Sequence, residues 1–102
     1  MKIVRTPRAI EGFREVSTYI AHNFGINALR EFQLRTKEWT KALKEMPKLG
    51  SVDEEISTEE REYRSVTIYR RSVMEYRIID DTILIVDFYD TRRSVTLSPQ
   101  YE

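Results

Sequence analysis

The sequence predicts an α+β fold, in which an N-terminal strand and an α-helical hairpin pack on one face of a small antiparallel β-sheet. Residues 2 to 46 hold one short extended run and two runs whose apolar side chains recur every three or four positions, as in amphipathic helices. Residues 63 to 90 hold three strand-like runs, joined by two-residue links that force antiparallel pairing. A length of 102 residues is typical of one domain, so we expect a single domain over residues 1–102.

The opening residues predict a first strand and a first helix. The strand is KIVR at residues 2 to 5, and Pro7 ends it because proline lacks the amide donor of a strand and suits the first turn of a helix. Thr6 is a typical N-cap residue, and HNFG at residues 22 to 25 supplies a glycine for the helix exit. The predicted apolar stripe of this helix consists of Ile10, Phe13, Val16 and Ile20.

A second helix is predicted from Asn27 to the residue before Pro47, since proline cannot continue a helix. Steps of three and four residues place its apolar side chains on one side. Two such helices joined by a short glycine turn form an antiparallel hairpin, whose stripe must be covered by another element. The predicted stripe of the second helix consists of Leu29, Phe32, Thr36, Trp39, Leu43 and Met46.

Three strands are predicted at residues 63–69, 72–79 and 82–90, linked by the dipeptides RR and DD. Alternation places Leu84, Val86 and Phe88 on one face of the last strand, and Ile83, Ile85, Asp87 and Tyr89 on the other. In the middle strand Met74, Tyr76 and Ile78 oppose Val73, Glu75, Arg77 and Ile79. We therefore expect one apolar face packed on the hairpin and one mixed face partly open to water or to a partner. The tail at about residues 94–102 has no pattern, and we expect it to be loose.

Composition excludes several classes of function. No apolar run approaches the length of a membrane span, and the N-terminus lacks the features of a signal peptide, so we expect a cytoplasmic protein with no membrane contact. The chain has no cysteine, and its one histidine, His22, cannot form a histidine-built zinc site or a histidine relay by itself. Its three glycines form no phosphate-binding cluster. We expect no cofactor and no metal.

Carboxylates offer one alternative chemistry. Glu75, Asp87 and Asp90 could gather on the mixed face and hold Mg²⁺ for a nuclease, but ion pairs with Arg77 explain them more simply. The acidic decade at residues 53–62 is typical of a solvated loop, and alternatively of a flap that competes with an anionic partner. A formal net charge of zero argues against a dedicated nucleic-acid binder.

Arginine and tyrosine are concentrated in the second half of the chain. Guanidinium groups bind phosphates in a bidentate manner and tyrosine rings stack on bases, which suits RNA binding. The same residue types also serve as ordinary strand surface residues or as hot spots of a protein interface. The set consists of Tyr63, Arg64, Tyr69, Arg70, Arg71, Tyr76, Arg77, Tyr89, Arg92 and Arg93.

Scattered motifs over some ninety residues resemble the RelE/ParE superfamily, the small toxins of bacterial type II toxin-antitoxin and plasmid stabilisation systems. The motifs lie in VRTPRAIEGFREVSTYIAHNFGINALREF, WTKALKEMPKLG and EYRIIDDTILIVDFYDTRRS. They comprise Pro7 and Ala9, Tyr19-Ile20, Ala28 and Phe32, Leu43, Pro47 and Gly50, Tyr76-Arg77, and Arg92-Arg93.

The resemblance implies a helical hairpin on a small antiparallel sheet and a cognate antitoxin that wraps the toxin in a hetero-oligomer. It also implies one of two targets: ribosome-bound mRNA, cut without metal in the RelE branch, or DNA gyrase in the ParE branch. The chain departs from the RelE pattern at Ser72-Val73, where a tyrosine-arginine pair is expected, unless Arg70 or Arg71 replaces that arginine. Asp90 stands where many ParE-like sequences have a histidine, and places a carboxylate where a phosphate would approach.

Both departures weaken the nuclease interpretation, and the helical half with its MPKLG exit is more similar to the ParE branch, so the resemblance favours a toxin that binds and inhibits DNA gyrase and arrests growth. Its predicted partner-binding residues are Arg64, Tyr76, Arg77, Arg92 and Arg93. The first alternative is a metal-independent, ribosome-dependent endoribonuclease with catalytic residues among Arg70, Arg71, Arg77, Tyr89, Arg92 and Arg93. The second alternative is a non-toxic relic that retains antitoxin binding.

Overall fold

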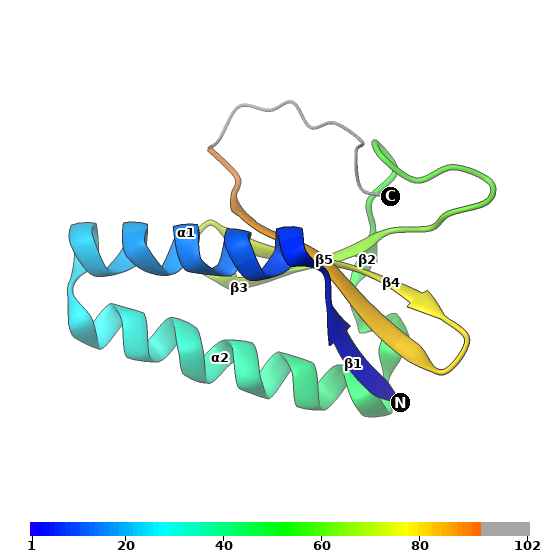
Figure 1. Ribbon diagram of the computed structural model, residues 1–102, viewed down its shortest axis with the longest axis horizontal. Helices are drawn as coiled ribbons and strands as arrows, with labels where there is room; N and C mark the ends of the chain where they lie inside the picture. Colours follow the sequence, from blue (N-terminus) through cyan, green and yellow to red (C-terminus); the bar gives the residue numbers. More distant parts are fainter. Residues whose placement is uncertain (93–102) are drawn as a thin grey trace.

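The computed structural model describes residues 1–92 and shows the predicted α+β fold (Figure 1). A five-stranded sheet with strand order β1-β5-β4-β3-β2 carries two long helices. The predicted tail at residues 94–102 and Arg93 lie outside the described residues. The elements, in chain order, are β1 (Lys2–Arg5), α1 (Pro7–Phe24), α2 (Ile26–Glu45), the short 3-10 helix η1 (Pro47–Leu49), β2 (Ser51–Val52), β3 (Arg64–Tyr69), β4 (Ser72–Ile79) and β5 (Thr82–Asp90).

Helix α1 begins at the predicted N-cap and lies directly against β5. The Thr6 hydroxyl accepts a hydrogen bond from the amide of Ala9 at 3.0 Å and donates one to the carbonyl of Val86 at 3.2 Å. The predicted stripe is correct for Val16 and Ile20, but Ile10 is 57 % exposed. Ala9 and Gly12 are buried instead, because only small side chains let the first half of the helix approach the strand this closely.

Helix α2 follows after Gly25, whose φ of 95° suits glycine. It buries Phe32, Thr36 and Leu43, as predicted, with Leu29 and Trp39 partly buried against the core. Met46 is exposed, contrary to the prediction, because the helix ends at Glu45 and the chain turns away from the stripe.

The aromatic rings of α1, α2 and β5 meet in the core. Phe13 stacks on Phe32 with ring centroids 5.2 Å apart, and contacts Phe88 edge-on at 5.0 Å. This contact fixes α1 between its partner helix and β5, which positions the end of α1 near the end of β5.

The sheet confirms the three predicted strands and adds two pairings that alternation does not reveal. β1 pairs with β5 in parallel, and the short β2 pairs with β3. The links between β3 and β4 and between β4 and β5 contain Arg70 and Asp80 at φ of 55° and 54°, the left-handed geometry of tight hairpin turns without glycine.

A β-bulge in β5 changes which of its side chains reach the core. Glu75 pairs with Asp87, but the next residue of β4, Tyr76, pairs with Ile85, so Val86 is an extra residue. The core therefore receives Ile83, Ile85 and Phe88, rather than the predicted set of Leu84, Val86 and Phe88. The prediction for β4 is correct, since Met74, Tyr76 and Ile78 all pack in the core.

The second face of the sheet differs from the prediction of a partly open face, because its centre is buried. Val73 and Glu75 are buried, and so is Asp87, the register partner of Glu75. The carboxyl group of Asp53, from the segment between β2 and β3, forms a hydrogen bond with that of Glu75. The acidic decade is therefore anchored to the sheet at its first residue.

Candidate functional site

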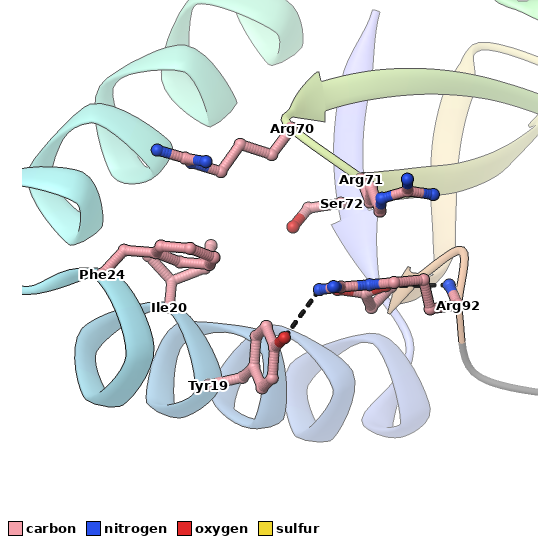
Figure 2. Close-up of a pocket in the computed structure, with 8 residues that line it drawn as sticks. Tyr19, Ile20, Phe24, Arg70, Arg71, Ser72 and Arg92 are labelled. Carbon is pink, nitrogen blue, oxygen red and sulfur yellow. Dashed lines mark hydrogen bonds and ion pairs between the residues drawn. The ribbon is translucent and has the colours of Figure 1, made fainter.

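A small pocket lies between the end of α1, the turn from β3 to β4, and the end of β5 (Figure 2). Its cavity volume is about 90 Å³. We call it the arginine pocket, and it is lined by Tyr19, Ile20, Phe24, Arg70, Arg71, Ser72, Asp90 and Arg92.

The tight turn between β3 and β4 presents two consecutive arginines at this pocket. The left-handed backbone of Arg70 directs its side chain over the ring of Phe24, with the guanidinium carbon 4.2 Å from the ring centroid. Figure 2 shows Arg70 and Arg71 on opposite sides of Ser72, whose hydroxyl points into the pocket. The turn therefore spreads two positive charges around one buried serine.

Arg92 crosses the pocket from the end of β5 and meets α1. Its Nε and Nη2 donate to the two carboxylate oxygens of Asp90 at 3.1 and 3.0 Å, and Nη2 also donates to the Tyr19 hydroxyl at 2.6 Å. These hydrogen bonds from Arg92 hold the pKa of Asp90 below its ordinary value. Because the Tyr19 hydroxyl accepts from Arg92, it keeps its own proton for donation.

Half of the predicted catalytic set comes together here. Arg70, Arg71 and Arg92 line the pocket, although the chain separates Arg92 from the other two by about twenty residues. Two others lie elsewhere: the guanidinium of Arg77 lies over the Tyr63 ring at 5.5 Å, and the Tyr89 hydroxyl donates to Glu75. Arg93 is outside the described residues.

Two predicted partner-binding residues, Tyr76 and Arg64, make contacts within the fold. Tyr76 has no exposed surface, so it cannot contact a partner, and we correct its role to a structural one. Arg64 donates to the backbone carbonyls of Gly50 and Lys48 at 2.8 and 3.3 Å. Both residues secure the chain just after α2.

The three carboxylates considered for Mg²⁺ do not converge. Glu75 and Asp87 face each other across β4 and β5, but Asp90 lies in the arginine pocket and pairs with Arg92. Over residues 1–92, no group of three His, Cys, Asp or Glu side chains is placed to hold a metal ion. The structure therefore does not support the carboxylate-based nuclease alternative.

Burial raises the pKa of Glu75. Its side chain is 1 % exposed, and this desolvation, together with the nearby charge and hydrogen bond of Asp53, raises its pKa to about 8. At neutral pH Glu75 is therefore protonated, and it forms its hydrogen bond with Asp53 as the neutral acid. The pair links the segment after β2 to the centre of the sheet.

Sequence reasoning missed three residues of the pocket: Tyr19, Phe24 and Ser72. Tyr19 and Phe24 stand outside the apolar stripe of α1, and an aromatic residue on the exposed side of a helix was the available signal. Ser72 was noted only as a departure from the RelE pattern, because only the turn conformation places its hydroxyl in the cavity.

Comparison with protein families gives a match over residues 3–95 to the model described as the ParE toxin of the type II toxin-antitoxin system, parDE. The chain belongs to the ParE toxin family. The toxin has no significant match among curated proteins. None of its helices within residues 1–92 is both long and apolar enough to cross a membrane.

Proposed function

We propose that this ParE-family toxin acts in the cytoplasm by binding DNA gyrase, and that a cognate antitoxin neutralises it by covering the same surface. Family membership supports the toxin role. The observation that favours protein binding over RNA cleavage is the paired state of Arg92, whose guanidinium is engaged by both oxygens of Asp90.

RNA cleavage needs positive charge that is free to stabilise the reacting phosphate, and a base close to it. In this pocket Asp90 neutralises Arg92, and the nearest candidate base among the predicted residues, Tyr89, is hydrogen bonded to Glu75 outside the pocket. Arg77 is also directed elsewhere, toward Tyr63. Over residues 1–92, the pocket therefore keeps positive charge on Arg70 and Arg71, but none of the predicted catalytic residues supplies a base there.

An apolar patch beside the arginine pocket supports a protein interface. Phe24 and Ile26, at the tip of the helical hairpin, are 42 % and 56 % exposed, and Tyr19 is also exposed. The ring of Tyr19 packs edge-on against Phe24, with centroids 6.2 Å apart. Protein interface hot spots are enriched in aromatic residues and arginine, and both are exposed side by side here. We call Tyr19, Phe24 and Ile26 the hairpin-tip patch.

Supercoiling assays with purified gyrase test the proposal. The wild-type toxin is expected to inhibit supercoiling, and Ile26→Ser in the hairpin-tip patch is expected to weaken inhibition at least about tenfold, as for an interface hot spot. Ile10→Ser is the matched control, because Ile10 is equally exposed but lies near the other end of the hairpin. Full inhibition by the Ile26 variant would contradict the assigned surface, and no inhibition by the wild type would contradict the target.

Growth measurements test the toxin and antitoxin roles together. Expression of the toxin alone is expected to arrest growth, and co-expression of the protein encoded beside it is expected to restore growth. Growth arrest without gyrase inhibition would favour the endoribonuclease alternative, which the meeting of Arg70, Arg71 and Arg92 supports. Mapping mRNA ends after induction would then reveal cuts within codons. Harmless expression of folded protein would instead favour a non-toxic relic.

A further inference from the structure

The arginine pocket has more positive charge than its own residues neutralise. Three arginines and one aspartate line it, and the aspartate is paired with Arg92. Over residues 1–92, the guanidinium groups of Arg70 and Arg71 form no ion pair, although Arg71 is close enough to Asp90 to contribute to its lowered pKa. The lining therefore carries two net positive charges.

Neutral donors accompany these charges. The Tyr19 hydroxyl accepts from Arg92 at 2.6 Å and can donate its own proton, and the Ser72 hydroxyl points into the same space (Figure 2). Both can donate to an oxygen atom, as arginine does. The donors come from α1, the β3–β4 turn and the end of β5, so they surround the cavity instead of forming a flat surface.

Size limits the ligand. A cavity of about 90 Å³ has the volume of about three water molecules, which is close to the size of one tetrahedral oxyanion. The ring of Phe24, on which a base could stack, is already covered by Arg70. A phosphate monoester carries about two negative charges at neutral pH, whereas an internal phosphodiester carries one. The monoester therefore matches the charge of the lining.

We propose that the arginine pocket binds a terminal phosphate group, such as that of a nucleotide or of a 5′-phosphorylated nucleic-acid end. Arg70 and Arg71 pair with the phosphate oxygens, while Tyr19 and Ser72 donate hydrogen bonds. Arg92 stays paired with Asp90 and holds Tyr19 in place. The site binds and does not cleave, and it goes beyond gyrase inhibition, since it concerns a small anion that the toxin binds by itself.

Titrations of the purified toxin, without gyrase, test this site. Inorganic phosphate is added first, and amide and arginine side-chain NMR shifts are followed. Two further titrations distinguish a nucleotide from a nucleic-acid end as the origin of the phosphate. One uses adenosine monophosphate, and the other uses a short single-stranded DNA with either a 5′-phosphate or a 5′-hydroxyl. We expect shifts at the β3–β4 turn with phosphate, and at least about tenfold tighter binding of the 5′-phosphorylated DNA than of the 5′-hydroxyl DNA. Equal affinity for the two DNA ends would overturn the proposal.

Three variants locate the site. Arg71→Gln is expected to weaken phosphate binding about tenfold or more, while Arg30→Gln, which removes an exposed arginine on α2 outside the pocket lining, leaves it unchanged. Asp90→Asn keeps an acceptor for Arg92 but removes the competing negative charge, so it is expected to tighten binding. A purely structural role of the pocket predicts no such gain. Unchanged affinity in Arg71→Gln, or weaker binding in a folded Asp90→Asn variant, would overturn the proposal.

Discussion

The hydroxyl of Tyr76 accepts a hydrogen bond from the amide of Gly50 at 2.9 Å and donates one to the carbonyl of Pro47 at 2.6 Å. This buried pair of bonds ties the exit of α2 to the middle of β4. Gly50 is required at this contact, because a Cβ atom there would lie 2.7 Å from the same hydroxyl. The ring that the sequence suggested for partner binding therefore holds the helical hairpin to the sheet.

Replacing Tyr76 with phenylalanine is expected to lower the free energy of unfolding by about 1–3 kcal/mol, because the amide of Gly50 is left buried without a partner. Urea denaturation followed by circular dichroism measures this change. Tyr69→Phe is the control, since the structure gives the Tyr69 hydroxyl no hydrogen bond over residues 1–92. Equal stability of the two variants would show that the Tyr76 hydroxyl contributes little.

Gly12→Ala is expected to destabilise the toxin by about 1–3 kcal/mol, the usual cost of overpacking. The added Cβ would lie 2.5 Å from the carbonyl oxygen of Phe88, and backbone of the central sheet cannot move away cheaply. Thermal unfolding measures the loss. Thr18→Ala, at an exposed position of the same helix, is expected to leave the melting temperature nearly unchanged. A stabilised Gly12 variant, the result expected from helix propensity alone, would contradict this close approach.

Thr6→Ala is expected to cost about 1 kcal/mol or slightly more, because it removes the N-cap of α1 together with a bond to the carbonyl of Val86. Thr6→Ser keeps the hydroxyl and is expected to recover most of the stability. Comparison of both variants by urea denaturation separates the cap from the packing of the threonine methyl group. Equal losses in the two variants would assign the effect to the methyl group.

The stability of the toxin is expected to fall as the pH rises from about 5 to about 8. Glu75 has a pKa of about 8 in the folded protein, against an ordinary value of 4.5. Between these values the folded state binds the extra proton, so rising pH favours unfolding, by at most about 1.4 kcal/mol per pH unit. Above pH 8 both states are deprotonated at this residue and the decline from this source ends.

The variant Glu75→Gln, which resembles the protonated form, tests that pH dependence. It is expected to flatten the stability profile between pH 5 and pH 8, measured by urea denaturation at several pH values. Glu45→Gln, at an exposed position at the end of α2, is the control and should keep the wild-type slope. An unchanged slope in the Glu75 variant would assign the pH dependence to other groups.

The pattern of the sequence determined the helices and strands almost to the residue. Three- and four-residue steps predicted α1 and α2, and alternation predicted β3, β4 and β5, because these periodicities depend only on local backbone geometry. The N-cap at Thr6 and the stop at Pro47 are equally local. Because these signals are local, the sequence also indicated the α+β class, and the family motifs could be recognised without the structure.

Other features depend on contacts between distant parts of the chain, and only the tertiary structure decided them. The bulge at Val86 exchanged the predicted faces of β5 on its N-terminal side, so Ile83 and Ile85 reach the core with Phe88, since register is set by the partner strand. The approach of α1 to β5 buried Ala9 and Gly12 and left Ile10 exposed. Tyr19 and Arg92, far apart in sequence, meet at 2.6 Å because the hairpin packs across the end of β5. The sequence showed which side chains are charged or aromatic, whereas only the fold brings those of the arginine pocket together.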